Sequence, residues 1–207
     1  MSIHLTAAQA SAVTGLSLKA INKAIDLRTI PSTARAKNGV RKRYVSEPAL
    51  VCLKLEAKGL GELPLSFRKR IFDLVLTHPE MATVRPVEAV QIDVEQARRE
   101  LHRSIDELKQ AEKMVTADAE VMGGVPVVAG TRIPVGALSA MLSQGATPEE
   151  IVEGYPSLST AQVRLAQVYT SAHPRRGRPA AIRPWAQPEG GVQVRKTIRP
   201  LGVTGPR

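Results

Sequence analysis

Residues 3–58 space their hydrophobic side chains in a way that predicts two short helices and then a pair of strands. Thr6 and Gln9 have the spacing of a capping box, so the first helix begins there, and Gly15 suits the turn that ends it. Ser17 then begins a second helix. The apolar residues of this second helix share one face: Leu18, Ile21 and Ile25. The opposite face is polar and carries Lys19, Asn22, Lys23 and Asp26.

A basic hairpin follows the second helix. Asn38-Gly39 indicates a tight turn between two strands, and Ser46 begins a further helix. A hairpin beside a DNA-reading helix contacts phosphates and holds the helix in register, while Lys and Asn hydrogen-bond base edges. The residues predicted to bind DNA in this unit are Ser17, Lys19, Asn22, Lys23, Arg41, Lys42 and Arg43. The alternative interpretation of the polar helix positions is a solvated face.

The middle of the chain predicts connecting structure and one longer amphipathic helix. A helix near residues 65–76 and an apolar, strand-like run at 87–92 come first. Residues 94–115 then repeat apolar residues every seven positions and fill the same side with small or apolar ones: Val94, Leu101, Leu108 and Val115, with Ala97, Ser104, Ile105 and Ala111. Two interpretations fit this helix, since it either pairs with its copy in a dimer or docks onto a neighbouring domain.

Glycine and proline punctuate the next stretch of the chain. The apolar run 125–129 lies between Gly124 and Gly130, which predicts a short strand and a turn, and Pro134 suits the first turn of a helix. Two further capping boxes follow, formed by Thr147 with Glu150 and by Ser159 with Gln162. Two short capped helices joined by a tight turn make a second helix-turn-helix candidate.

This second unit offers its own candidate contacts. The second of its helices presents Thr160, Gln162 and Arg164 near its N-terminus, where a recognition helix contacts DNA. The alternative is that the two helices form a dimer interface. In the preceding turn a structural role outweighs a phosphate contact: Thr131 caps the turn, and Arg132 pairs with Glu149 or Glu153.

The charge of the chain changes this picture, because it is concentrated at the two ends. The formal net charge is +10. Residues 1–58 hold 10 basic and 3 acidic side chains, residues 59–172 hold 11 and 15, and residues 173–207 hold 8 and 1. Clustered Lys and Arg displace counterions from a polyphosphate backbone, so the basic ends favour contact with nucleic acid. A basic tail equally suits an acidic protein surface.

Composition excludes several classes of protein. The single cysteine rules out a disulfide framework, and the four histidines are scattered, so neither a metal site nor a cofactor is predicted. The chain lacks an apolar run of membrane length and a signal-peptide pattern, so we expect it in the cytoplasm, away from membranes. No enzyme is predicted, because the segment from Gly124 to Thr131 lacks the Lys and the spacing of a phosphate-binding loop. Few aromatic residues argue against stacking on single-stranded RNA.

Residues 173–207 form a tail of distinct composition. Six Pro and five Gly among these 35 residues make a packed core improbable. The sequence Arg176-Gly177-Arg178-Pro179 resembles the core of an AT-hook. Further along, Trp185 stands close to Ile182 and Arg183, and residues 194–199 alternate apolar and basic side chains. Aromatic and arginine anchors in such a segment predict folding onto a partner.

Two resemblances to known families connect these parts. Residues 3–58 resemble the winged helix-turn-helix of MerR-type regulators in the order of their elements. Residues 120–179 resemble an antitoxin-like domain family through three motifs in sequence: Gly-Gly-x-Pro-Val at 123–127, Gly-Thr-Arg-Ile-Pro-Val at 130–135 and Tyr-Pro-x-Leu at 155–158. Chains with both units resemble VapB-type antitoxins, the partners of PIN-domain ribonuclease toxins.

The resemblance implies an antitoxin that represses its own operon through operator DNA and neutralises a PIN-like ribonuclease toxin through its tail, as a homodimer or a larger toxin–antitoxin assembly. PIN-type ribonucleases hold metal in a cluster of carboxylates, which suits Arg or Lys from an inhibitor. The residues predicted to bind the toxin are Arg178, Ile182, Arg183, Trp185, Arg195, Lys196 and Arg199. The alternative is a stand-alone, MerR-like DNA-binding transcriptional regulator, which the chain before residue 173 would serve equally well.

The expected fold is therefore mainly α with small β elements. Residues 1–60 form a winged helix-turn-helix and residues 61–118 connecting helices. Residues 119–172 form a second, small helical helix-turn-helix domain, and residues 173–207 an extended basic tail.

Overall fold

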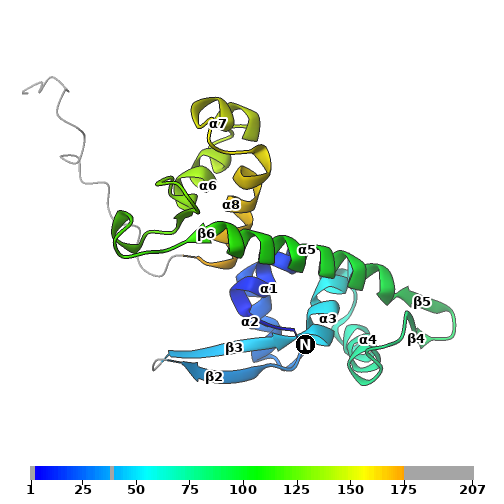
Figure 1. The fold of residues 1–207 in the computed structure, drawn as a ribbon. Helices are drawn as coiled ribbons and strands as arrows, with labels where there is room; N and C mark the ends of the chain where they lie inside the picture. Colours follow the sequence, from blue (N-terminus) through cyan, green and yellow to red (C-terminus); the bar gives the residue numbers. More distant parts are fainter. Residues whose placement is uncertain (1–2, 38–39, 175–207) are drawn as a thin grey trace, which may run out of the picture. The chain divides into compact units, whose positions relative to one another are not determined.

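The computed structural model describes residues 3–37 and 40–174, which belong to one compact unit, Met1–Arg175. Within these ranges the protein is mainly α-helical with small antiparallel sheets, as predicted (Figure 1). None of the helices in the described part has the length and apolar character needed to cross a membrane.

The elements follow one another along the chain in three groups. The first group contains β1 (His4–Thr6), α1 (Ala7–Thr14), α2 (Leu18–Asp26), β2 (Thr33–Lys37), β3 (Val40–Ser46) and α3 (Glu47–Ala57). The second contains the short 3₁₀ helix η1 (Leu60–Glu62), α4 (Leu65–Thr77), β4 (Thr83–Val87), β5 (Val90–Asp93) and α5 (Val94–Met114). The third contains β6 (Val115–Thr116), η2 (Met122–Gly124), β7 (Val127–Val128), α6 (Val135–Ser143), α7 (Pro148–Gly154) and α8 (Thr160–Ala172).

The first helix begins and ends, and the second begins, where their capping residues predict. The hydroxyl of Thr6 accepts a hydrogen bond from the backbone N–H of Gln9, and the side-chain oxygen of Gln9 accepts one from the backbone N–H of Thr6 (3.0 Å). Gly15 ends α1 at a φ of 84°, a left-handed conformation that favours glycine. Ser17 is the N-cap of α2, and its hydroxyl accepts from the backbone N–H of Ala20. These local signals are confirmed.

The buried face of α2 differs from the prediction at one position. Leu18, Ile21 and Ile25 were predicted to share one apolar face; Ile21 and Ile25 are buried, whereas Leu18 is 39% exposed. Leu18 is the first residue of α2 and precedes its two apolar neighbours by one and two turns, so it lies at the outer end of the stripe. Ala24 completes the buried face instead.

The hairpin forms a three-stranded sheet with the start of the chain. β2 and β3 pair antiparallel with Thr33 opposite Tyr44, and β1 joins the other edge of β3, which gives the order β1-β3-β2. The turn residues Asn38 and Gly39 lie outside the described residues. The succession of α1, α2, β2, β3 and α3 is the order predicted for residues 3–58, whereas the short strand β1 was not predicted. We call β2 and β3 the wing.

The middle of the chain contains the predicted helix and a hairpin that was not predicted. α4 covers residues 65–77, close to the prediction. The single strand expected at 87–92 is wrong, because two antiparallel strands, β4 and β5, meet there on either side of Glu88 and Ala89. One strand would place Glu88 on the same face as the apolar residues Val90 and Ile92, and a turn removes this conflict.

α5 docks onto other helices of the same chain. Its buried residues, all 2% exposed or less, are Val94, Ala97, Leu101, Ile105, Leu108 and Ala111. They pack against α1, α3 and α8 (Figure 1). The docking interpretation is thus confirmed, and the apolar stripe is already covered within the chain. Val115, predicted as the last heptad position, lies in β6 rather than in the helix.

The second helix-turn-helix candidate also has its predicted caps. Capping boxes open α7 at Thr147 and α8 at Ser159. The predicted strand is the two-residue β7, which pairs with β6. Pro134 is the N-cap of α6, one position before the predicted first turn, and its lack of an N–H costs nothing there.

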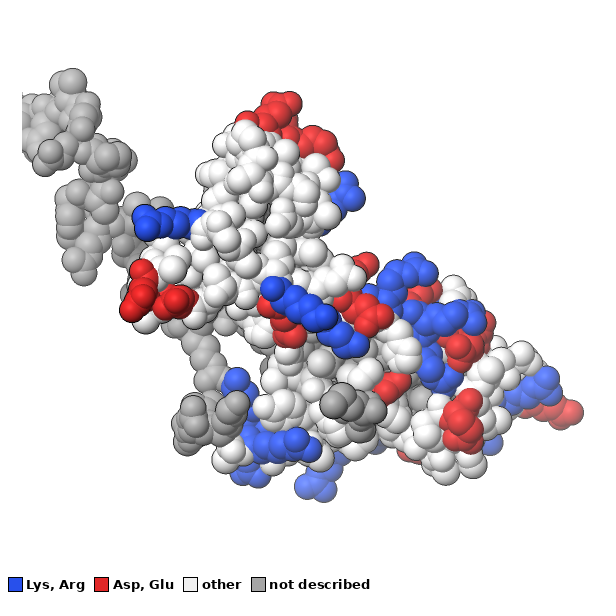
Figure 2. Space-filling model, in the orientation of Figure 1, with Lys and Arg blue, Asp and Glu red and all other residues white. Residues whose placement is uncertain are grey.

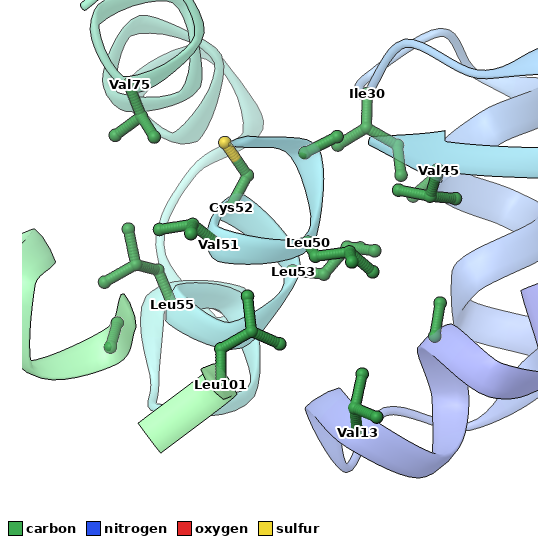
Figure 3. Close-up of a cluster of buried hydrophobic side chains, with 14 of the residues drawn as sticks. Val13, Ile30, Val45, Leu50, Val51, Cys52, Leu53, Leu55, Val75 and Leu101 are labelled. Carbon is green, nitrogen blue, oxygen red and sulfur yellow. The ribbon is translucent and has the colours of Figure 1, made fainter. Parts of the chain in front are cut away.

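Two clusters of buried side chains stabilise the described unit. The larger one includes Val13, Leu53 and Leu101, which converge from α1, α3 and α5 (Figure 3). The smaller one joins β7 and the helices α6, α7 and α8. Ala172, at the end of α8, belongs to the larger cluster, so α8 contributes to both.

We expect Cys52 to be unreactive in the folded protein. Its side chain is fully buried in α3, and burial raises the pKa of the thiol, so the reactive thiolate is scarce at neutral pH. A thiol reagent at neutral pH should label Cys52 only after denaturant has unfolded the chain. Fast labelling of the native protein, at the rate seen in denaturant, would contradict this burial.

Candidate nucleic-acid interface

The exposed face of α2 carries both predicted lysines. Lys19 and Lys23 are exposed and stand four residues apart, and Asn22 is half-buried beside them. Figure 2 shows Lys and Arg side chains gathered at the end of the molecule where α2 and the wing lie. Like charges at this spacing on a helix repel each other, and a bound anion relieves that repulsion. Ser17 is already committed to capping α2.

The wing separates its basic residues onto two faces. Side chains alternate along a strand, so Arg41 and Arg43 share a face with the buried Val45. Lys42 lies on the opposite face, together with its pairing partner Arg35. Sequence order alone grouped Arg41, Lys42 and Arg43 as one basic edge, whereas the strand places them on both sides of the wing.

An ion pair connects the wing to the end of α2. The guanidinium of Arg43 donates to the carboxylate of Asp26 over 2.5 Å, and both side chains are about half exposed. Such a pair contributes up to about 1 kcal/mol to folding, so its main consequence is geometric. It sets the wing against α2 and puts Arg41 on the side of the wing that faces the helix. Asp26 is the only acidic residue among the first 46, which is the one sequence signal for this contact.

The outer face of the wing is held by a different contact. The guanidinium of Arg35 lies over the ring of Tyr44, 5.7 Å from its centroid, at cation–π distance. Arg35 and Lys42 give this face positive charge as well, but they point away from the Asp26–Arg43 contact.

The second helix-turn-helix candidate is acidic where it would meet DNA. The side chain of Gln162 is engaged in the capping box of α8, and Arg164 pairs with Glu149 at 3.6 Å. Thr160 is half-buried. Figure 2 shows Asp and Glu gathered over the end of the molecule that carries α7. Glu150 adds to this charge, and the hydrogen bond from the backbone N–H of Thr147 lowers the pKa of its carboxyl, so the charge persists to a lower pH.

The turn before α6 is structural, in agreement with the preferred interpretation of Thr131. Its hydroxyl donates to the backbone oxygen of Val128 and accepts from the backbone N–H of Ile133. The ion pair predicted for Arg132 with Glu149 or Glu153 is wrong, since among the described residues Arg132 pairs with neither and Glu149 pairs with Arg164 instead. Arg164 lies in the first turns of α8 and extends toward α7, where its guanidinium contacts the carboxylate of Glu149.

A polar contact links the two helix-turn-helix candidates through α5. The carboxylate oxygen Oε1 of Glu112 accepts from the amide nitrogen of Gln9 in α1 and lies 2.9 Å from Nε2 of His173, just after α8. These three residues are far apart in the sequence, and no local pattern predicts their contact. The tail begins at this point, and the residues predicted to bind a toxin, between Arg178 and Arg199, lie outside the described residues.

Comparison with known proteins yields one family and one relative. Residues 115–170, from β6 into α8, match the family described as "Protein of unknown function (DUF433)". Over 204 residues the chain is 28% identical to "Uncharacterized protein y4eO" of Sinorhizobium fredii strain NBRC 101917 / NGR234, a match that covers 92% of this chain and 90% of that protein. No solved structure matches the chain. The family match therefore coincides with the second helix-turn-helix candidate and does not reach residues 3–58, which we call the winged unit.

Proposed function

We propose that this chain is a DNA-binding antitoxin, in which the N-terminal winged unit binds operator DNA and the tail neutralises a PIN-like ribonuclease toxin. The observation that carries the DNA-binding part is the position of Lys19, Lys23 and Arg41. Lys19 and Lys23 share a helix face with Asp26, and Arg41 shares a strand face with Arg43. The Asp26–Arg43 ion pair joins these two faces, so all three basic residues are expected on the side where α2 meets the wing.

The arrangement suits the phosphate backbone and the major groove of DNA. A helix enters the major groove and reads base edges, for which Asn22 and the lysines of α2 have the required donors. A wing beside it contacts phosphates and fixes the position of the helix. Among the candidates in the wing, Arg41 and Arg43 face α2, and Arg43 is already paired with Asp26, so we assign the phosphate contact to Arg41.

Operator binding is assigned to the winged unit rather than to the second one. Glu149, Glu150 and Glu153 are all exposed on α7, and phosphates would be repelled there. Of the candidates on α8, Gln162 and Arg164 are already engaged in contacts within the unit, and Thr160 is half-buried. We propose that this second unit positions the tail and contributes to the buried core of the protein.

The antitoxin part of the proposal is supported by the motif series of residues 123–158 and by the composition of the tail. The tail holds eight basic residues and one acidic one, together with Trp185. Such a segment suits a partner whose active site is a cluster of carboxylates. The stand-alone regulator remains the second candidate, and it requires only the winged unit.

Replacing Lys23 or Arg41 by alanine should weaken binding to DNA from upstream of the gene about fivefold each, as expected for the loss of a contact of about 1 kcal/mol. For a lost phosphate contact, the slope of log affinity against log salt should also become shallower by about 1. Mobility-shift titrations at several salt concentrations measure both quantities.

Two controls make this experiment specific. Arg103→Ala removes the same charge from the exposed side of α5, and it should leave both affinity and slope unchanged. Lys42→Ala removes a charge from the wing face opposite Arg41, so it should have the smaller effect of the two wing variants. Equal binding by all four variants and the wild type would remove the winged unit from DNA recognition.

A further inference from the structure

An arginine follows the C-cap of α2, and its backbone has a conformation that favours glycine. Arg28 follows the C-cap residue Leu27 and has a φ of 51°, in the left-handed region. Its backbone N–H donates to the oxygen of Ile25 (3.0 Å), and that of Thr29 donates to the oxygen of Ala24 (2.9 Å). These two bonds make a Schellman motif with Arg28 at the position after the cap, where glycine is preferred because it lacks the Cβ that crowds the next carbonyl.

The same chain uses glycine for this conformation elsewhere. Gly15 after α1, Gly59 after α3 and Gly145 after α6 all have positive φ values. Within residues 3–37 and 40–174, Arg28 and Met122 are the non-glycine residues with positive φ. Arg28 is the one of the two that ends a helix of the winged unit, so the exception falls at the candidate DNA-reading helix.

Internal contacts do not account for this arginine. Its side chain is exposed, and within the described ranges its guanidinium has no hydrogen bond or ion pair. A cation at a helix C-terminus interacts favourably with the helix dipole, but a lysine at an unstrained neighbouring position would do so as well. Strain that persists without an internal contact points to an external one.

We propose that Arg28 binds a DNA phosphate at the C-terminal end of α2, an inference that rests on the proposed DNA-binding function. The guanidinium offers donors in a rigid fork that matches a phosphate with two parallel hydrogen bonds. Arg28 lies two residues beyond Asp26, which contacts the wing through Arg43, so its backbone is anchored where α2 and the wing meet. Arg28 and Arg41 would then hold the DNA backbone from the helix and from the wing.

The test is Arg28→Gly in the full-length protein, because stability and DNA binding should change in opposite directions. Glycine relieves the backbone strain, so Tm should rise by about 2–4 °C for a unit of this size. The same variant should bind DNA from upstream of the gene about 10-fold more weakly, with a salt slope shallower by about 1. Thermal unfolding and mobility-shift titration on one preparation give both numbers.

Arg28→Lys distinguishes the two-hydrogen-bond geometry of the guanidinium from its positive charge. It keeps the positive charge and the strain, so it should restore the salt slope but only part of the affinity, because lysine binds phosphate as a point charge. The inference is overturned if Arg28→Gly binds DNA like the wild type, or if its Tm falls. If Lys23→Ala weakens binding and Arg28→Gly does not, this inference alone is lost. If the wild type itself binds no DNA from this region, the proposed function and the inference are lost together.

Discussion

Removing residues 180–207 should abolish binding to the PIN-like ribonuclease and leave cells that express the toxin unprotected. The deleted segment holds Trp185 and the basic residues proposed to approach the acidic site of the toxin. The helices and both buried clusters lie within residues 3–174, so the truncated protein should still fold and bind DNA. Growth of co-expressing cells and co-purification with the product of the neighbouring reading frame measure the outcome.

Point variants test whether specific tail residues, and not merely the presence of the tail, are needed for toxin binding. Trp185→Ala and Arg183→Ala in the full-length chain should each weaken co-purification, whereas Arg103→Ala on α5 should not. Protection by the truncated protein at the wild-type level would refute the antitoxin proposal. In that case the stand-alone regulator accounts for the chain, with the tail adding only electrostatic affinity for DNA.

Leu101→Ala should lower the free energy of unfolding by about 3 kcal/mol, within the range for deleting a leucine from a packed core. Leu101 is fully buried on α5, in the same cluster as Val13 of α1 and Leu55 of α3 (Figure 3). Truncation leaves a cavity in the contact by which α5 holds the winged unit. Urea unfolding followed by circular dichroism measures the change.

Arg103→Ala is the matched control, because it lies two residues away on the exposed side of the same helix. It should change the free energy of unfolding by no more than about 0.5 kcal/mol. A cost below about 1 kcal/mol for Leu101→Ala would mean that α5 is not a central packing element of the unit.

Signals that act within one helical turn were predictable from the sequence. Thr6 with Gln9, Thr147 with Glu150 and Ser159 with Gln162 all form the predicted capping boxes. Each needs only two residues three positions apart, and no distant part of the chain competes for them. The strands of the wing follow from an equally local turn and from alternating side chains.

Contacts between distant residues were not predictable in this way. The heptads of α5 fit a dimer and a docked helix equally, and only the position of α1, α3 and α8 decides between them. Leu18 has the right spacing for the core face, yet the core ends before it. In the candidate site, the chain supplies Arg41, Lys42 and Arg43 in one run, and the register of the strand decides which of them faces α2.

The amide of Gln9 explains why glutamine, and not glutamate, stands at the third position of α1. Either residue completes a capping box, because the box uses only an acceptor oxygen. Here the oxygen accepts from Thr6 while the NH₂ group donates to Glu112 of α5 over 2.9 Å. A glutamate carboxylate at this position would still cap the start of the helix, but it would repel the carboxylate of Glu112 on α5. The acceptor oxygen of this one amide therefore caps the first helix of the winged unit, and its donor nitrogen connects that helix to α5.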